Sequence, residues 1–169
     1  MDNHSTDKTA EIATKFGAKV VLETEHKISK VRNTGAKNTN GTYLFFLDAD
    51  TIVKSSTLRL AYQGLTRENV YGGGAFVRFD DNLGKFILGE FIPSVWNWCS
   101  RTLKLAAGSF IFCKKEDFLR VGGFPESMYA GEEIEFVRKL KKINKKSKKE
   151  FLIIEEPPVI TSSRKLIWY

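Results

Sequence analysis

An uninterrupted apolar segment from Tyr43 to Leu47 dominates the pattern of hydrophobic and polar positions. Such a segment, bounded by the turn dipeptide Asn40-Gly41 and by acidic residues, is typical of a strand that is buried on both faces. Other apolar residues recur at helical spacing or form short strand-like runs. The pattern predicts helices over residues 7–16, 27–37, 55–65, 115–121 and 132–143, and strands over 18–22, 43–47, 70–79, 106–113 and 151–154.

Strands that alternate with helices predict an α/β fold with a mixed, mainly parallel sheet. No linker or internal repeat interrupts the pattern, so residues 1–169 are expected to form a single domain. The hydrophobic content of 42% is sufficient for a buried core and argues against global disorder. The dipeptide Pro157-Pro158 is expected to end the last strand, because proline lacks a backbone donor.

Hydropathy and charge limit the location and the partners. No apolar stretch reaches the roughly 20 residues that span a bilayer, and the polar segment Met1–His4 does not resemble a signal peptide. We therefore expect a cytoplasmic protein. The net charge of +7 is concentrated in the lysines between Lys141 and Lys149. These lysines form either a solvated helix end or a peripheral contact with an anionic membrane. Nucleic acid is not expected as a partner, because no recognised binding motif accompanies the charge.

Two acids, Asp48 and Asp50, follow the apolar segment one residue apart. Ligands of open α/β sheets bind at the carboxyl ends of the strands. Adjacent carboxylates repel each other unless a cation compensates their charge, and Mg²⁺ prefers oxygen ligands that include substrate phosphates. The pair therefore indicates either a metal that holds a diphosphate or a loop whose acids bond their own backbone.

Four segments occur in a characteristic order: residues 2–9, residues 32–35 leading to 48–50, residues 122–126, and residues 132–140. In this order they resemble the inverting nucleotide-sugar glycosyltransferases of family 2, which have the GT-A fold. The resemblance implies transfer of a sugar, with inversion, from a nucleotide-diphosphate-sugar donor to a hydroxyl acceptor, as in polysaccharide biosynthesis. It also implies Mg²⁺ or Mn²⁺ as the cofactor and a glycan, a lipid or another hydroxyl compound as the acceptor.

The resemblance assigns the donor side of the site to particular residues. Asp2, Arg32 and Asp48 match positions that contact the nucleotide. Asp50, together with Asp48, matches the metal-binding Asp-x-Asp (DXD) motif, in which the second acid usually holds the metal.

The resemblance also assigns the catalytic and acceptor side. In the pair Glu132-Glu133, Glu133 matches the general base, where the family usually has Asp. Acids in a first helical turn are also routine, because the helix dipole favours them. Gly108 and Ser109 match a strand beside the acceptor pocket. Trp96, in an aromatic segment, is expected either to shape the choice of acceptor or to pack in the core or at a dimer contact.

The family pattern opens with a strand, a helix and a second strand that have no counterpart here. We therefore expect an N-terminally truncated GT-A domain with unpaired strand edges and apolar faces around Val20, Leu22, Phe45 and Leu47. Two hypotheses follow from this expectation. One is a homodimer or a closed-up, shortened sheet, and the other, an alternative to the enzyme, is a non-catalytic GT-A-like module that self-associates or binds glycan.

Overall fold

The computed structural model describes residues 1–80, 94–95, 97–98, 101 and 106–163. Its elements, in chain order, are α1 (Thr9–Lys15), α2 (Ile28–Lys37), β1 (Tyr43–Leu47), β2 (Thr51–Ile52), α3 (Ser55–Thr66), β3 (Val70–Phe79), β4 (Phe110–Lys114), α5 (Lys115–Arg120), α6 (Glu132–Asn144) and β5 (Glu150–Thr161). Within these ranges, no helix combines the length and the apolar character that crossing a membrane requires.

Among the described residues, five strands form one mixed sheet in the order β1-β4-β3-β5-β2. β3 and β5 pair in parallel, whereas the β1–β4, β3–β4 and β2–β5 pairs are antiparallel. The predicted mixed α/β sheet is confirmed, and β1, β3 and β5 run in the same direction. The sheet nevertheless differs from a mainly parallel one in its neighbouring pairs, because β4 lies in the opposite direction between β1 and β3.

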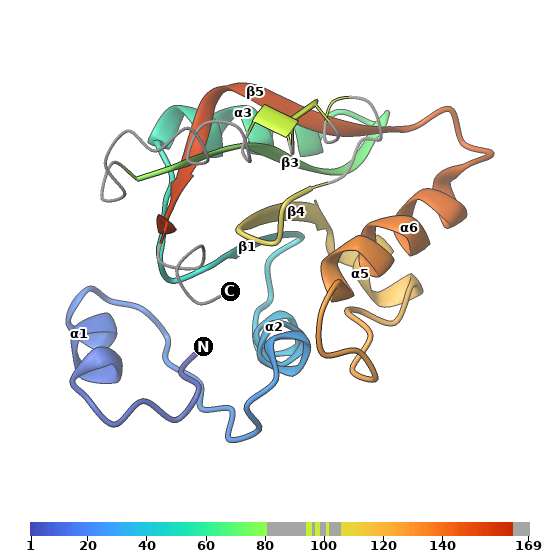
Figure 1. Ribbon diagram of the computed structural model, residues 1–169. Helices are drawn as coiled ribbons and strands as arrows, with labels where there is room; N and C mark the ends of the chain where they lie inside the picture. Colours follow the sequence, from blue (N-terminus) through green and yellow to red (C-terminus); the bar gives the residue numbers. More distant parts are fainter. Residues whose placement is uncertain (81–93, 96, 99–100, 102–105, 164–169) are drawn as a thin grey trace.

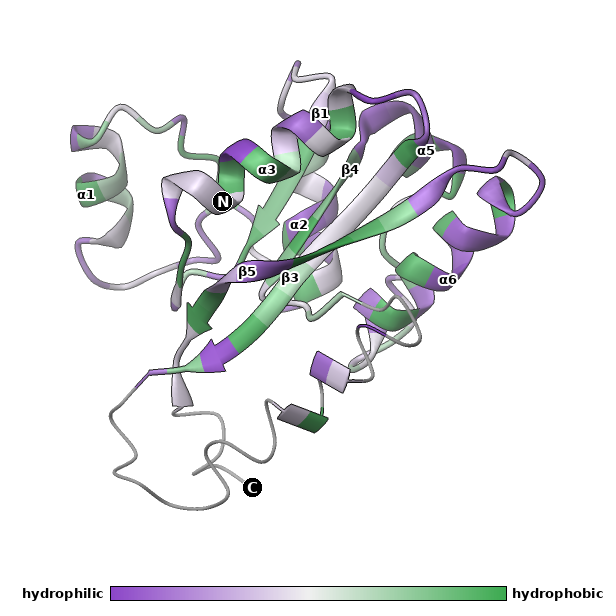
Figure 2. Ribbon diagram, turned by 90° about the horizontal axis from the view of Figure 1, so that it is seen from above, coloured by the Kyte–Doolittle hydropathy of each residue, from purple (hydrophilic) through white to green (hydrophobic). Residues whose placement is uncertain are grey.

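Helices cover both faces of this sheet (Figure 1). On one face, Ala61 and Leu65 of α3 belong to an apolar cluster with β3, β4 and β5. On the other face, the ring of Phe46 in β1 contacts Phe118 of α5 and Phe136 of α6. Hydrophobic residues follow the central strands, whereas α6 and the loop after it are mainly hydrophilic (Figure 2). The described part of the protein therefore has three layers, with the sheet between helices.

Three consecutive glycines lie in β3, which is the central strand of the sheet. A Cβ atom on Gly73 would lie 2.2 Å from the carbonyl oxygen of Leu152 and 2.3 Å from Cζ of Phe112. The missing side chain thus makes room for a phenylalanine ring from one neighbouring strand and for the backbone of the other. Close packing explains why a strand forms here in spite of the low strand propensity of glycine.

The prediction that β1 is buried on both faces is wrong. Leu44 and Phe46 are buried, whereas Phe45 and Leu47 are 37% and 45% exposed. The reason is that β1 is the outermost strand of the described sheet, and α3 packs mainly over β3 and β5. The exposure of these two side chains agrees with the apolar faces that the sequence predicts around Phe45 and Leu47.

The N-terminal segment also differs from its prediction. α1 forms close to the predicted place, but it buries none of its residues, and Phe16 is 86% exposed. Residues 18–22 form no regular strand and contribute only an isolated parallel bridge between Asp2 and Leu22. A single bridge leaves this segment outside the main sheet, and the side chain of Leu22 is exposed as a consequence.

β5 continues through Pro157-Pro158 instead of ending there as predicted. Its register against β3 shifts between Ala75 and Val77, which pair with Ile154 and Val159. The prolines fall inside this irregularity, where the ladder does not require their missing N–H groups.

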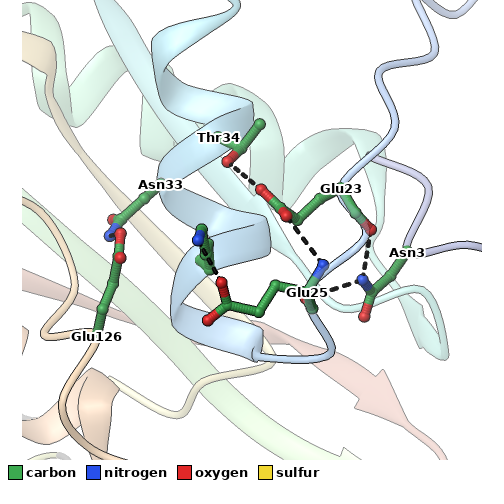
Figure 3. Close-up of polar contacts among 7 residues, drawn as sticks. Asn3, Glu23, Glu25, Asn33, Thr34 and Glu126 are labelled. Carbon is green, nitrogen blue, oxygen red and sulfur yellow. Dashed lines mark hydrogen bonds and ion pairs between the residues drawn. The ribbon is translucent and has the colours of Figure 1, made fainter.

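Helix α2 fastens other segments of the chain through consecutive side chains, which point about 100° apart around the helix. Nδ2 of Asn33 donates to the carbonyl oxygen of Phe124 at 2.9 Å and to Glu126 Oε1 at 2.8 Å, and the Phe124 N–H donates back to Oδ1 at 2.9 Å. On another side, the hydroxyl of Thr34 donates to Glu23 of the N-terminal segment at 2.7 Å (Figure 3). Two distant loops are thereby held against one helix.

We expect the substitution Gly73→Ala to lower the free energy of unfolding by about 1–3 kcal/mol, because the new methyl group overlaps backbone and ring atoms. Chemical denaturation measures the change. The matched control is Gly41→Ala, where the nearest atom to a Cβ, the carbonyl oxygen of Tyr43, lies 3.3 Å away. Equal stability of both variants would contradict this packing.

We expect Asn33→Ala to destabilise the fold by about 2–3 kcal/mol, because it leaves the backbone N–H and carbonyl of Phe124 without their partner. The exposed Asn38, whose side chain donates only to Thr34 O, supplies the control Asn38→Ala, with an expected loss of about 0.5 kcal/mol. Thermal and chemical denaturation compare the two. A loss at Asn33 as small as that at Asn38 would show that the loop does not depend on this side chain.

Candidate functional site

The residues predicted for the nucleotide and the metal lie together. Asp2, Arg32, Asp48 and Asp50 all line one cavity of about 860 Å³. Its walls come from the N-terminal segment, from α2 and from β1 with the turn that follows it. The volume is in the range of cavities that bind small ligands. The strand-end placement that the sequence predicted for Asp48 and Asp50 is observed.

Asp2 presents an acceptor to this cavity. Its backbone pairs with residues 21 and 23, and its Oδ2 accepts the N–H of Ser5 at 3.3 Å. Oδ1 is buried and has no hydrogen-bond partner among the described residues. A buried carboxylate oxygen without a donor is costly, so a ligand that offers an N–H or O–H group would be stabilised here.

Asp48 and Asp50 lie in the turn between β1 and β2. The backbone N–H of Asp48 donates to Ser109 O at 3.2 Å, and its carbonyl accepts the N–H of Thr51 at 3.1 Å. These bonds fix the turn against the start of β4. No cluster of three or more His, Cys, Asp or Glu side chains that could hold a metal occurs in the described part of the chain. Two carboxylates nevertheless fit a Mg²⁺-like ion that takes its other ligands from phosphates and water.

Arg32 joins the two halves of the site. Its Nη2 donates to Asp48 Oδ1 and to Gly108 O, both at 2.9 Å, and its Nη1 donates to Glu132 Oε1 at 3.0 Å. The guanidinium carbon lies 5.2 Å from the centre of the Phe124 ring. The side chain is only 10% exposed, so its charge acts with little screening by water.

Glu132 and Glu133 differ in their environment. The Glu132 side chain is 6% exposed and paired with Arg32, whereas Glu133 is half-buried. Burial raises the pKa of the Glu133 carboxyl, and the negative charges of Glu132 and Asp48 add to the rise, while its own backbone N–H and Arg32 oppose it. A carboxylate with a raised pKa is a stronger proton acceptor.

The structure describes two of the three residues that were predicted for the acceptor, Gly108 and Ser109. A Cβ on Gly108 would lie 3.2 Å from Nη2 of Arg32 and 3.6 Å from Cγ and Cδ of Glu133, so this glycine lies directly beside both side chains. Ser109 follows directly before β4, and its buried hydroxyl has no partner among the described residues. Trp96 lies outside the described residues.

Sequence reasoning missed the residues that hold the site together. The motifs that contain Asn33 and Phe124 assign no role to either residue. The signal that could have found Asn33 is its place between two other polar residues, Arg32 and Thr34, because neighbours on a helix face different segments. No local signal indicates that the Phe124 ring lies against Arg32, because that contact depends on the tertiary fold.

The fold and the sequence both match known glycosyltransferases. Among solved structures, the mannosyltransferase PcManGT from Pyrobaculum calidifontis, in complex with GDP-Man and Mn²⁺, aligns with a TM-score of 0.69 at 20% identity. The alignment covers 96% of this chain and 46% of that one, so this chain spans less than half of that neighbour's length. A comparison with curated protein sequences found no match.

The structural likeness confirms the predicted GT-A fold. The sequence profile of glycosyl transferase family 2 matches residues 1–122, which is most of the chain. These findings agree with the motifs that suggested the same family. The chain therefore belongs to glycosyl transferase family 2.

Proposed function

We propose that this domain transfers a sugar from a nucleotide-diphosphate-sugar donor to a hydroxyl acceptor, with inversion at the anomeric carbon. The observation that carries the proposal is that Asp2, Arg32, Asp48 and Asp50 line the same cavity, which Arg32 connects to the helix of Glu133. The solved mannosyltransferase, which holds GDP-Man and Mn²⁺, supports this class of donor and metal.

The donor is assigned to the cavity. The buried Oδ1 of Asp2 is suited to accept a hydrogen bond from the nucleobase or the ribose. The acids Asp48 and Asp50 would hold Mg²⁺ or Mn²⁺ together with the diphosphate. When bound, such an ion supplies positive charge against the departing diphosphate. Arg32 adds a fixed positive charge beside Asp48.

The acceptor is assigned to the side of Glu133 and Gly108. In one displacement, the acceptor oxygen bonds to the anomeric carbon, and the carbon–oxygen bond to the diphosphate breaks with its electron pair on the diphosphate. The carboxylate of Glu133 takes the hydroxyl proton as general base. Ser109, whose buried hydroxyl has no partner among the described residues, is the second residue that we assign to the acceptor.

A second candidate is a non-catalytic module that self-associates or binds glycan. The exposed faces of Leu22, Phe45 and Leu47 favour it, because apolar surface of this kind is typical of contacts with another protein. Homodimer formation through this surface is part of that candidate. Peripheral contact of a cytoplasmic enzyme with anionic lipid through Lys141–Lys149 is a proposal that rests on charge alone.

We expect Asp50→Asn to weaken the binding of UDP or GDP, measured by calorimetry with Mn²⁺, by at least about tenfold, which is about 1.4 kcal/mol. The reason is the loss of a carboxylate ligand to the shared ion. Glu116→Gln removes an exposed acid on α5 and should bind like the parent. Equal affinities for Asp50→Asn and the parent would show that the metal is held elsewhere.

We expect Glu133→Gln to reduce sugar transfer by about 10²–10⁴-fold, because an amide cannot accept the hydroxyl proton. Binding of the nucleoside diphosphate should change little. Since the base acts only when deprotonated, transfer by the parent should fall as the pH is lowered through the raised pKa of Glu133. Full activity of Glu133→Gln would assign the base to another residue.

A further inference from the structure

Both terminal nitrogens of the Arg32 guanidinium donate hydrogen bonds to protein acceptors. Nη1 donates to Glu132, while Nη2 donates to Asp48 and to the carbonyl of Gly108. These acceptors belong to the first turn of α6, to the turn after β1 and to the segment before β4. A planar fork that serves three acceptors fixes their relative positions more strictly than a flexible ammonium would.

The carboxylate of Glu132 accepts a hydrogen bond from the Arg32 guanidinium. It is therefore not placed to contact the sugar acceptor. Its side chain is 6% exposed, and an ion pair is what makes such burial of a carboxylate tolerable. Because adjacent residues of a helix point about 100° apart, holding Glu132 against Arg32 directs Glu133 to a different side.

Glu133 lies beside the backbone of Gly108, which has no side chain. A Cβ there would lie 3.6 Å from Cγ and Cδ of Glu133, so the Glu133 side chain rests beside the glycine whose carbonyl Arg32 holds. The backbone carbonyl of the next residue, Ser109, accepts a hydrogen bond from the backbone N–H of Asp48. The base and the first acid of the donor site are therefore connected through one arginine and one short segment.

We propose that Arg32 and Glu132 are a positioning pair, which locks the first turn of α6 to Asp48 and thereby holds the Glu133 carboxylate over Gly108. The inference deepens the proposed function and rests on it for the role of Glu133. It assigns to Arg32 the task of aligning the two halves of the site, beyond the nucleotide contact that the family resemblance implies.

Steady-state transfer kinetics of the full chain test the pair. Glu132→Ala, which removes the acceptor of Arg32, should lower kcat by about 10²-fold with little change in KM, because misplacement of a base by about 1 Å has that effect. Glu132→Gln keeps an oxygen that can accept a hydrogen bond from Nη1 of Arg32. Its kcat should therefore be about tenfold higher than that of Glu132→Ala. Arg32→Lys keeps the charge without the fork and should lose kcat like Glu132→Ala.

The control is Arg120→Lys, which alters an ion pair with the buried Asp117 on α5, outside the cavity, and should leave kcat unchanged. A loss in Glu132→Gln as large as that in Glu133→Gln would overturn the proposal, because Glu132 would then be the base. Parent-like kcat in Glu132→Ala, with only a lower melting temperature, would also overturn it.

A second readout does not require transfer. The charged groups that act on the pKa of the Glu133 carboxyl are Glu132 and Asp48, which raise it, and Arg32, which lowers it. Carbon-13 NMR titration of the Glu133 carboxyl should show a higher pKa in Arg32→Gln, since the one opposing positive charge is lost, and a lower pKa in Glu132→Gln. If the parent transfers no sugar, the proposed function fails, whereas the titration still tests whether Arg32 and Glu132 act on Glu133. An unchanged Glu133 pKa in both variants would overturn the positioning pair.

Discussion

The structure depends most on one half-buried cation, the guanidinium of Arg32, and on the acceptors arranged around it. Glu132 brings negative charge into a region with little water, where an unpaired carboxylate would be costly, and Asp48 adds a second, half-buried carboxylate. The arginine compensates both and also satisfies the carbonyl of Gly108. Its neighbour Asn33 fastens the loop that contains Phe124, whose ring lies against Arg32. One turn of α2 thus gathers segments that are distant in the sequence.

Much of the fold could be predicted because local signals and tertiary demands agree. The apolar run of β1, the helical spacing in α3 and α6, and the acids at the end of β1 all lie where the sequence placed them. The motif order also identified the family correctly. Such patterns can be interpreted because the hydrophobic period and the turn residues determine secondary structure over a few neighbouring positions.

The rest could not be predicted because it depends on which strands become neighbours. The apolar run of β1 by itself predicts burial on both faces, whereas Phe45 and Leu47 are exposed because β1 is the outer strand of the described sheet. The continuation of β5 through Pro157-Pro158 depends on a register shift against β3. The pairing of Arg32 with Glu132 joins residues from different helices, and spacing in the sequence carries no trace of it.

We propose that Arg32 aligns a metal-assisted donor site with the helix that carries the base. Crystals grown with Mn²⁺ and a nucleoside diphosphate test it most directly, because the anomalous scattering of manganese locates the ion. We expect manganese bonded to a carboxylate oxygen of Asp50 and to the diphosphate, with Arg32 still donating to Glu132 and Gly108. Manganese bound away from Asp48 and Asp50, or Arg32 turned fully onto the phosphates with Glu132 released, would contradict it.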